Sequence, residues 1–157
     1  MTEIEIEQAI RTAFKFTPVP PEGNLYRADA VGRYANPSGD RLKGRTWEEV
    51  VELKQVLDPI WLLTPEAFRY YIPAYVLNEY RRRAQPHSRP MSVYHLLLAP
   101  NERDSFIAEN LGRLTTEEYL ALRHVVFREM ESGDDEAESA WELGWKTPEN
   151  PWAQNLS

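Results

Sequence analysis

LTPEAFRYYIPAYVLNEY, residues 63–80, combines a helix start with a dense run of aromatic side chains. The start is Thr64-Pro65-Glu66, a pattern typical of a first helical turn. The same run contains Pro73, and a proline in a helix interior costs about 3 kcal/mol because it removes a backbone hydrogen bond. The sequence therefore predicts either one aromatic helix whose packing offsets that cost, or two short helices.

Thr-x-x-Glu patterns predict three further helix starts. Thr2 with Glu5, Thr46 with Glu49, and Thr115 with Glu118 have the spacing of a capping box, in which each residue bonds the other's backbone. The helix after Thr115 is apolar around most of its circumference, so we expect it to be central. Including the aromatic block, the expected helices cover about residues 2–17, 46–58, 63–83, 115–131 and 135–143, with the apolar run 92–99 assigned to a further helix and a strand as its alternative.

Residues 18–45 form a long connection rich in proline and glycine. Connections longer than about 15 residues are usually functional, docked on the fold or disordered. Spaced apolar side chains, among them Leu25, Tyr26 and Leu42, favour a docked and ordered segment. Such a docked segment can include a short hairpin, and disorder is the alternative.

The aromatic block also carries a resemblance. Residues 63–75, together with Trp47, Leu114-Thr115 and a C-terminal helix containing Trp141, resemble a family of small bacterial proteins of unknown function. The resemblance covers nearly the whole chain and implies no activity. By analogy alone, some small acidic bacterial proteins are immunity partners of secreted toxins.

Composition indicates one domain. The chain has 157 residues, of which 42% are hydrophobic and 27% charged, and it lacks cysteine. No signal-like N-terminus or run of 18 apolar residues is present, so we expect a cytoplasmic protein without a membrane segment. The predicted fold is mainly α, a single compact domain over residues 1–157 with five or six helices, one long ordered Pro/Gly-rich connection, and a tail at 144–157 that can move.

Charge is distributed unevenly along the chain. Residues 1–100 carry 13 Lys or Arg against 12 Asp or Glu, whereas residues 101–157 carry 5 against 13. An acidic surface repels phosphate and attracts a basic partner, although a solvated helix face is the simpler alternative. The leading functional hypothesis is a protein-interaction module that binds a basic partner through an acidic surface. Its candidate residues are Glu131, Asp134, Asp135, Glu136 and Glu138.

Catalytic and metal-binding patterns are missing from the sequence. None of His87, His95 and His124 has a second ligand at the spacing that joins one helix face, so we expect no catalytic residue, metal or cofactor. The polar stripe of its helix marks His124 as a surface residue. The alternative is a small-ligand binder or enzyme with a pocket under residues 18–45, where an anion would be held by Arg27, Arg33, Tyr34 and Arg69.

Nucleic-acid binding is a second alternative. It rests on a basic cluster, Arg81, Arg82 and Arg83 with Arg69 and Arg89, interleaved with Tyr70, Tyr71, Tyr75 and Tyr80 as stacking platforms. A helix end explains the arginines, burial explains the tyrosines, and the acidic remainder opposes phosphate. An acidic mimic of nucleic acid belongs to the same class of hypotheses.

Overall fold

The computed structural model describes residues 2–28, 42–53, 60–82 and 105–153. Within these ranges the chain is helical, and the predicted mainly α fold is confirmed. Two short 3₁₀ turns, η1 (Glu22–Asn24) and η2 (Ile60–Leu62), and a π-helical turn, η5 (Trp141–Trp145), accompany the helices. The six helices of the described ranges are α1 (Glu3–Ala13), α2 (Trp47–Glu52), α3 (Pro65–Arg82), α4 (Ser105–Gly112), α5 (Thr116–Glu131) and α6 (Asp135–Ala140).

All three predicted capping boxes are confirmed. At the start of α5, the Thr115 hydroxyl accepts from the Glu118 amide at 3.1 Å, and the Glu118 carboxylate accepts from the Thr115 amide at 2.8 Å. The boxes at Thr2 and Thr46 have the same two bonds. Each box satisfies backbone N–H groups that have no partner inside the helix.

The aromatic block forms one continuous helix. α3 runs 18 residues through Pro73 without interruption, so the first of the two sequence alternatives is the one adopted. Burial explains how the helix tolerates the proline, because Phe68, Ile72, Ala74 and Val76 are fully covered. Its apolar packing offsets the hydrogen bond that Pro73 cannot donate.

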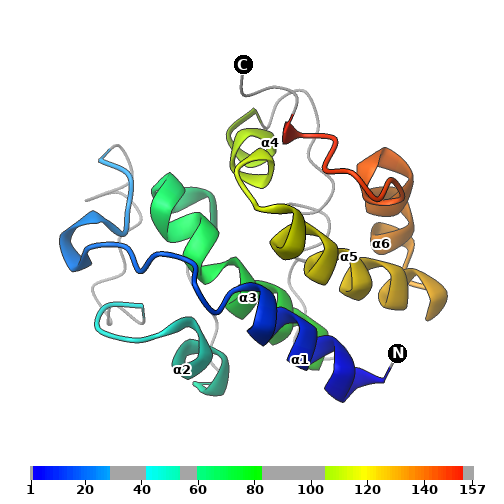
Figure 1. Cartoon of the computed structure of the whole chain (residues 1–157), viewed down its shortest axis with the longest axis horizontal. Coiled ribbons are helices and arrows are strands. Elements are labelled where there is room, and N and C mark those ends of the chain that lie inside the picture. The colour runs from blue at the N-terminus through cyan, green and yellow to red at the C-terminus, as the bar shows by residue number, and fades with distance from the viewer. Residues whose placement is uncertain (1, 29–41, 54–59, 83–104, 154–157) are drawn as a thin grey trace.

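α5 is the central helix, as its all-round apolar sequence predicted. It packs against α1, α3, α6 and η5, so that α1 and α3 lie on one side of it and α6 on the other (Figure 1). Tyr119, Leu122, Val125 and Val126 on α5 are completely buried. The one exposed face of α5 therefore carries the side chains that can meet other molecules.

Some parts of the chain differ from the sequence expectation. α4 was not predicted, although Ile107 and Leu111 are buried one turn apart on it. α2 ends at Glu52, and the rest of the expected helix, residues 54–59, lies outside the described residues, as does the run 92–99. In the connection 18–45 the structure describes η1 and an antiparallel bridge from Tyr26 to Leu63, and residues 29–41 lie outside the description.

A C-terminal latch, residues 146–153, is docked on α4, α5 and η5. Trp152 lies against Trp145, with ring centroids 5.2 Å apart, and Trp145 stacks on Tyr119 at 4.9 Å. The Asn150 side-chain amide donates to the Leu111 carbonyl at 2.9 Å, and the Tyr119 hydroxyl donates to the Thr147 carbonyl at 2.6 Å. Residues 146–153 of the predicted tail, 144–157, thus pack on the body of the protein.

Candidate functional site

A groove of about 740 Å³ runs between α1 and α5. The two helices pack against each other, and small side chains on both of them leave room above their contact. Its apolar lining consists of Ala9, Ala13, Phe16, Leu120 and Ala121. Its polar lining includes Gln8, Thr12, Arg69, Glu117 and His124.

One end of the groove is closed by a buried charge network. The Glu118 carboxylate, with a side chain only 1% exposed, accepts from the Arg69 Nε at 3.0 Å. It also accepts from the Thr17 hydroxyl, so one side chain joins α3, α5 and the turn after α1. Removing one partner of such a pair leaves an unpaired buried charge. Because Glu118 is buried where it caps α5, its carboxylate needs the Arg69 guanidinium as a partner.

His124 lies further along the groove and is half-buried. Burial lowers the pKa of its imidazole, and the neighbouring Arg123 cation lowers it further. The neutral form is therefore favoured. The sequence placed His124 on the polar surface of its helix, and the structure places it in a groove wall on that surface.

The predicted anion-binding residues are not brought together by the described part of the structure. Arg69 lines the α1–α5 groove, whereas Arg27 donates to the Trp61 carbonyl at 3.0 Å and lies 4.6 Å from the Phe106 ring centre. Arg33 and Tyr34 lie outside the described residues. A smaller cavity of about 230 Å³ does lie against residues 19–25 and 44–46, but neither Arg27 nor Arg69 lines it.

The predicted acidic residues have different environments. Asp134 is the N-cap of α6, because its carboxylate accepts from the Glu136 and Ala137 amides, each at 2.9 Å. Glu136 precedes Trp141 by five residues, which places it about 140° from Trp141 around the helix, on the opposite side of α6. Glu131, Asp135 and Glu138 are exposed, and in the described ranges their carboxylates form no hydrogen bond or ion pair.

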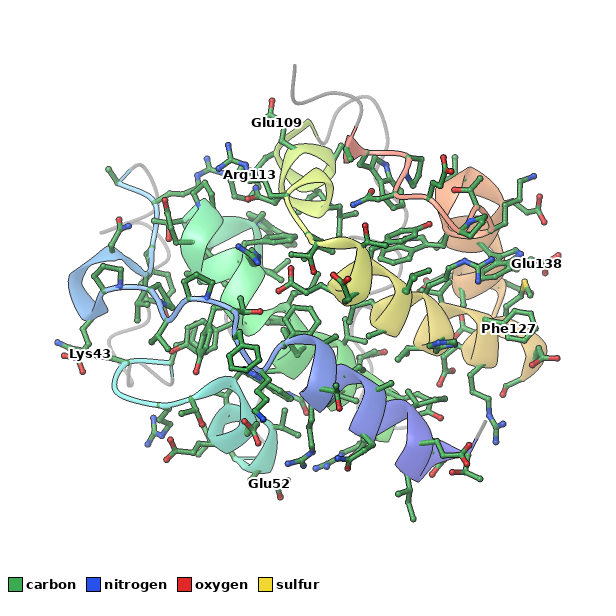
Figure 2. All side chains as sticks on the ribbon, in the orientation of Figure 1. Lys43, Glu52, Glu109, Arg113, Phe127 and Glu138 are labelled. Atoms are coloured by element: carbon green, nitrogen blue, oxygen red, sulfur yellow. The ribbon has the colours of Figure 1, made fainter. Side chains whose placement is uncertain are left out.

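Two aromatic side chains lie beside Glu131 and Glu138, and Asp135 precedes Glu138 by three residues, which places these two carboxylates on the same side of α6. Phe127 of α5 packs on Trp141 at the end of α6, with ring centroids 5.1 Å apart. Glu131 follows Phe127 by one helical turn, and Glu138 precedes Trp141 by one turn. Figure 2 shows Phe127 and Glu138 on the same edge of the molecule. We call this set, Phe127, Glu131, Asp135, Glu138 and Trp141, the acidic-aromatic surface.

Trp141 is held in a fixed orientation. The Arg123 guanidinium lies 4.6 Å from the Trp141 ring centre, on a side chain that donates to the Trp145 and Lys146 carbonyls, both at 2.7 Å. The half-buried Trp141 ring is therefore contacted by both Phe127 and Arg123, and Phe127 keeps 41% of its surface exposed. Aromatic groups held in this way lose little conformational entropy on binding.

Comparison with known proteins identifies the family. The sequence model of DUF6714, a family of unknown function, matches residues 2–156. The chain belongs to the DUF6714 family. No curated protein and no solved structure matches it.

Two arginines on the N-terminal side of this DUF6714 protein are paired with carboxylates of the same molecule. Arg81 binds Glu7 and Glu52, with three bonds of 3.0 Å, and Arg11 binds Glu48 at 3.1 Å. The bonds to Glu7 and Glu52 raise the pKa of Arg81 above its usual range. These pairs contrast with the carboxylates of the acidic-aromatic surface.

The side chains invoked for nucleic-acid stacking are not available on the surface of the DUF6714 protein. Tyr70, Tyr71, Tyr75 and Tyr80 are all buried. Of the arginines in that cluster, Arg69 and Arg81 are paired with carboxylates, while residues 83 and 89 lie outside the described ranges. Base stacking needs exposed aromatic faces, so these tyrosines cannot provide it in this conformation.

The described residues form neither a metal-type cluster nor a membrane-length helix. Across residues 2–28, 42–53, 60–82 and 105–153, no three His, Cys, Asp or Glu side chains are grouped as a metal site requires. None of the helices in those ranges has the length and apolarity needed to cross a membrane.

Sequence reasoning missed Phe127 as a candidate site residue. It counted Phe127 among the apolar side chains of a covered helix, and only the approach of α6 shows that this residue lies at the surface. Trp141 entered the sequence analysis only through the family resemblance, and in the structure its side chain is half-buried. Glu118 was assigned only to capping, because its contact with Arg69 joins two distant parts of the DUF6714 chain.

Proposed function

We propose that this protein binds a basic segment of another protein through the acidic-aromatic surface. The observation that carries the proposal is the packed pair Phe127 and Trp141 beside three carboxylates without partners in the described structure. Aromatic side chains supply much of the binding energy of protein interfaces. Carboxylates around them select a partner of opposite charge and accelerate its association.

Lysine and arginine fit this surface better than other side chains. A guanidinium or ammonium group can lie on an aromatic face and bond a neighbouring carboxylate at the same time. The protein itself shows the first half of this arrangement, where Arg123 lies on Trp141. A partner arginine could therefore contact Phe127 while pairing with Glu131 or Glu138.

The test compares two variants with equal charge changes. The surface variant is Glu131→Gln, Asp135→Asn and Glu138→Gln, and it leaves the Asp134 cap intact. The control variant is Glu22→Gln, Glu66→Gln and Glu109→Gln, whose carboxylates are exposed and form no bond in the described ranges. Wild type and the two variants are each used to capture partners from the native host. The captured basic protein is then purified and its affinity for each of the three is measured by titration.

We expect the surface variant to lose about tenfold or more in affinity, and the control variant to bind like wild type. Phe127→Ala should also weaken binding, because it removes the aromatic face on which the partner cation lies. The proposal fails if no stoichiometric basic protein is captured, or if both triple variants bind it equally.

Small-ligand binding in the α1–α5 groove is a second candidate function. The observation favouring it is Arg69 in the wall of the groove, where its two terminal amino groups form no hydrogen bond in the described structure. Grooves of this volume with a few polar groups are typical of ligand sites. Ala9→Trp, at a partly exposed position of the lining, would fill the groove, so a ligand found by thermal-shift screening of carboxylic acids should bind wild type and not this variant.

A further inference from the structure

α1 presents exposed apolar side chains at both of its ends. Ile4 is 81% exposed, and Phe16 and Val19, just after the helix, are 87% and 68% exposed. Between them the outward face carries Gln8 and Thr12, which are polar and uncharged. Single exposed apolar residues are ordinary, but here one lies at the start of α1 and two lie in the segment that follows its end, so both ends of the helix offer apolar contacts.

The exposed side of α1 also has opposite charges at its two ends. Glu5 in its first turn lies beside Gln8 on the exposed side, and the end of the helix is followed by the exposed Lys15. Arg11 is engaged by Glu48 and Glu7 by Arg81, so those two face the protein's own α2 and α3. The outward face is thus acidic at one end, polar in the middle and basic at the other.

We propose that α1 pairs antiparallel with α1 of a second copy of this chain, about a two-fold axis. In this arrangement Ile4 of one copy lies opposite Phe16 of the other, and the axis passes near the level of residue 10. The distance between the levels of residues 4 and 16 is about 18 Å along a helix. Both apolar contacts therefore form at once, as an isologous interface requires.

The electrostatics favour a second copy over other occupants. Antiparallel pairing brings Lys15 of each copy opposite Glu5 of the other, and it opposes the two helix dipoles. A uniformly basic partner would gain at the acidic end and be repelled by Lys15. A surface with opposite charges at its two ends is complementary to itself.

The α1–α5 groove contributes to the same contact. Phe16 and Glu5 belong to its lining, so its open side borders the exposed face of α1. Phe16 of the second copy would reach the mouth of the groove at Glu5 and Gln8. One 11-residue helix covers less than the roughly 800 Å² per partner of a stable interface, so the dimer is expected to be reversible.

The chain contains no cysteine, which makes disulfide trapping a clean test. A mixture of Gln8→Cys and Thr12→Cys proteins is oxidised, and Ser139→Cys, exposed on α6, is the control. Sedimentation over a concentration series is run on wild type, Phe16→Ser and Lys15→Glu. Arg113→Glu has the same charge change as Lys15→Glu, at an exposed position on another element.

We expect a species of twice 18.3 kDa that grows with concentration, and efficient crosslinking of the Gln8→Cys and Thr12→Cys mixture only. Phe16→Ser and Lys15→Glu should each raise the dimer dissociation constant by about fivefold or more, and Arg113→Glu should not. Both changed side chains are exposed, so folding, followed by circular dichroism, should be retained. A monomer at every concentration overturns the proposal, as does a dimer insensitive to Phe16→Ser and Lys15→Glu.

Discussion

Gly144→Ala should destabilise the protein through a clash with Trp152. A Cβ atom at residue 144 would lie 2.8 Å from Cζ2 and 3.0 Å from Cη2 of the Trp152 ring. The ring cannot retreat easily, because it packs on Trp145 at 5.2 Å and on Tyr119 at 6.4 Å. The added methyl group must therefore displace either the latch or η5.

The size of the effect follows from two opposing contributions. Overpacking a core position costs roughly 1–3 kcal/mol, and replacing glycine by alanine in a helical turn returns at most about 1 kcal/mol. We therefore expect Gly144→Ala to lose about 1–2 kcal/mol. Trp152→Ala alone should lose about 3–5 kcal/mol, since the ring is buried. With the ring removed, Gly144→Ala should be neutral or slightly stabilising.

A double-mutant cycle measures this coupling. Urea unfolding of wild type, both single variants and the double variant is followed by far-UV circular dichroism, because removing a tryptophan alters fluorescence. We expect a coupling energy of about 1–3 kcal/mol. Gly23→Ala is the control, because a Cβ there meets nothing within 4 Å. Full stability of Gly144→Ala, or an equal loss with and without Trp152, would refute the assignment of the clash.

Three other predictions concern the helix cap, the ion pair and the histidine. Thr46→Ala should lower the free energy of unfolding by about 1 kcal/mol in urea titrations, because the α2 capping box is lost. Glu118→Gln keeps a side chain suited to capping but removes the charge that pairs with Arg69, so a loss of roughly 1–3 kcal/mol is expected in the same assay, and an unchanged midpoint would contradict it. Burial lowers the pKa of His124 in the folded state, and Arg123 lowers it further. Because this pKa lies below the unfolded value of about 6.5, His124 favours the folded state above that pH, and this contribution to stability is lost as the pH falls. Between about pH 7.5 and pH 5.5, the unfolding midpoint should therefore fall more for wild type than for His124→Gln. Equal falls in the two midpoints would contradict the assignment.

Local signals in the sequence predicted local structure well. A capping box needs only two residues three positions apart, so Thr2, Thr46 and Thr115 marked helix starts that the structure confirms. The apolar circumference of α5 likewise predicted its central position. α4 was missed because a short helix held by tertiary packing of Ile107 and Leu111 carries little periodic signal.

The candidate sites depended on contacts that the sequence does not display. The acidic cluster was visible in the composition. The sequence did not show that Asp134, and not the adjacent Asp135, accepts from the first amides of α6. The pairing of Phe127 with Trp141 requires α5 and α6 to meet. The groove between α1 and α5 likewise joins segments far apart in the chain.

The bond between Thr17 and Glu118 spans 101 residues, and this separation has a consequence for biosynthesis. At translation rates of about 5–20 residues per second, the ribosome needs roughly 5–20 s to progress from one to the other. During that time Ile6, Ile10 and Phe14 have no α5 to pack against. The nascent N-terminal helix must therefore remain soluble or be protected by a chaperone until translation has passed α5.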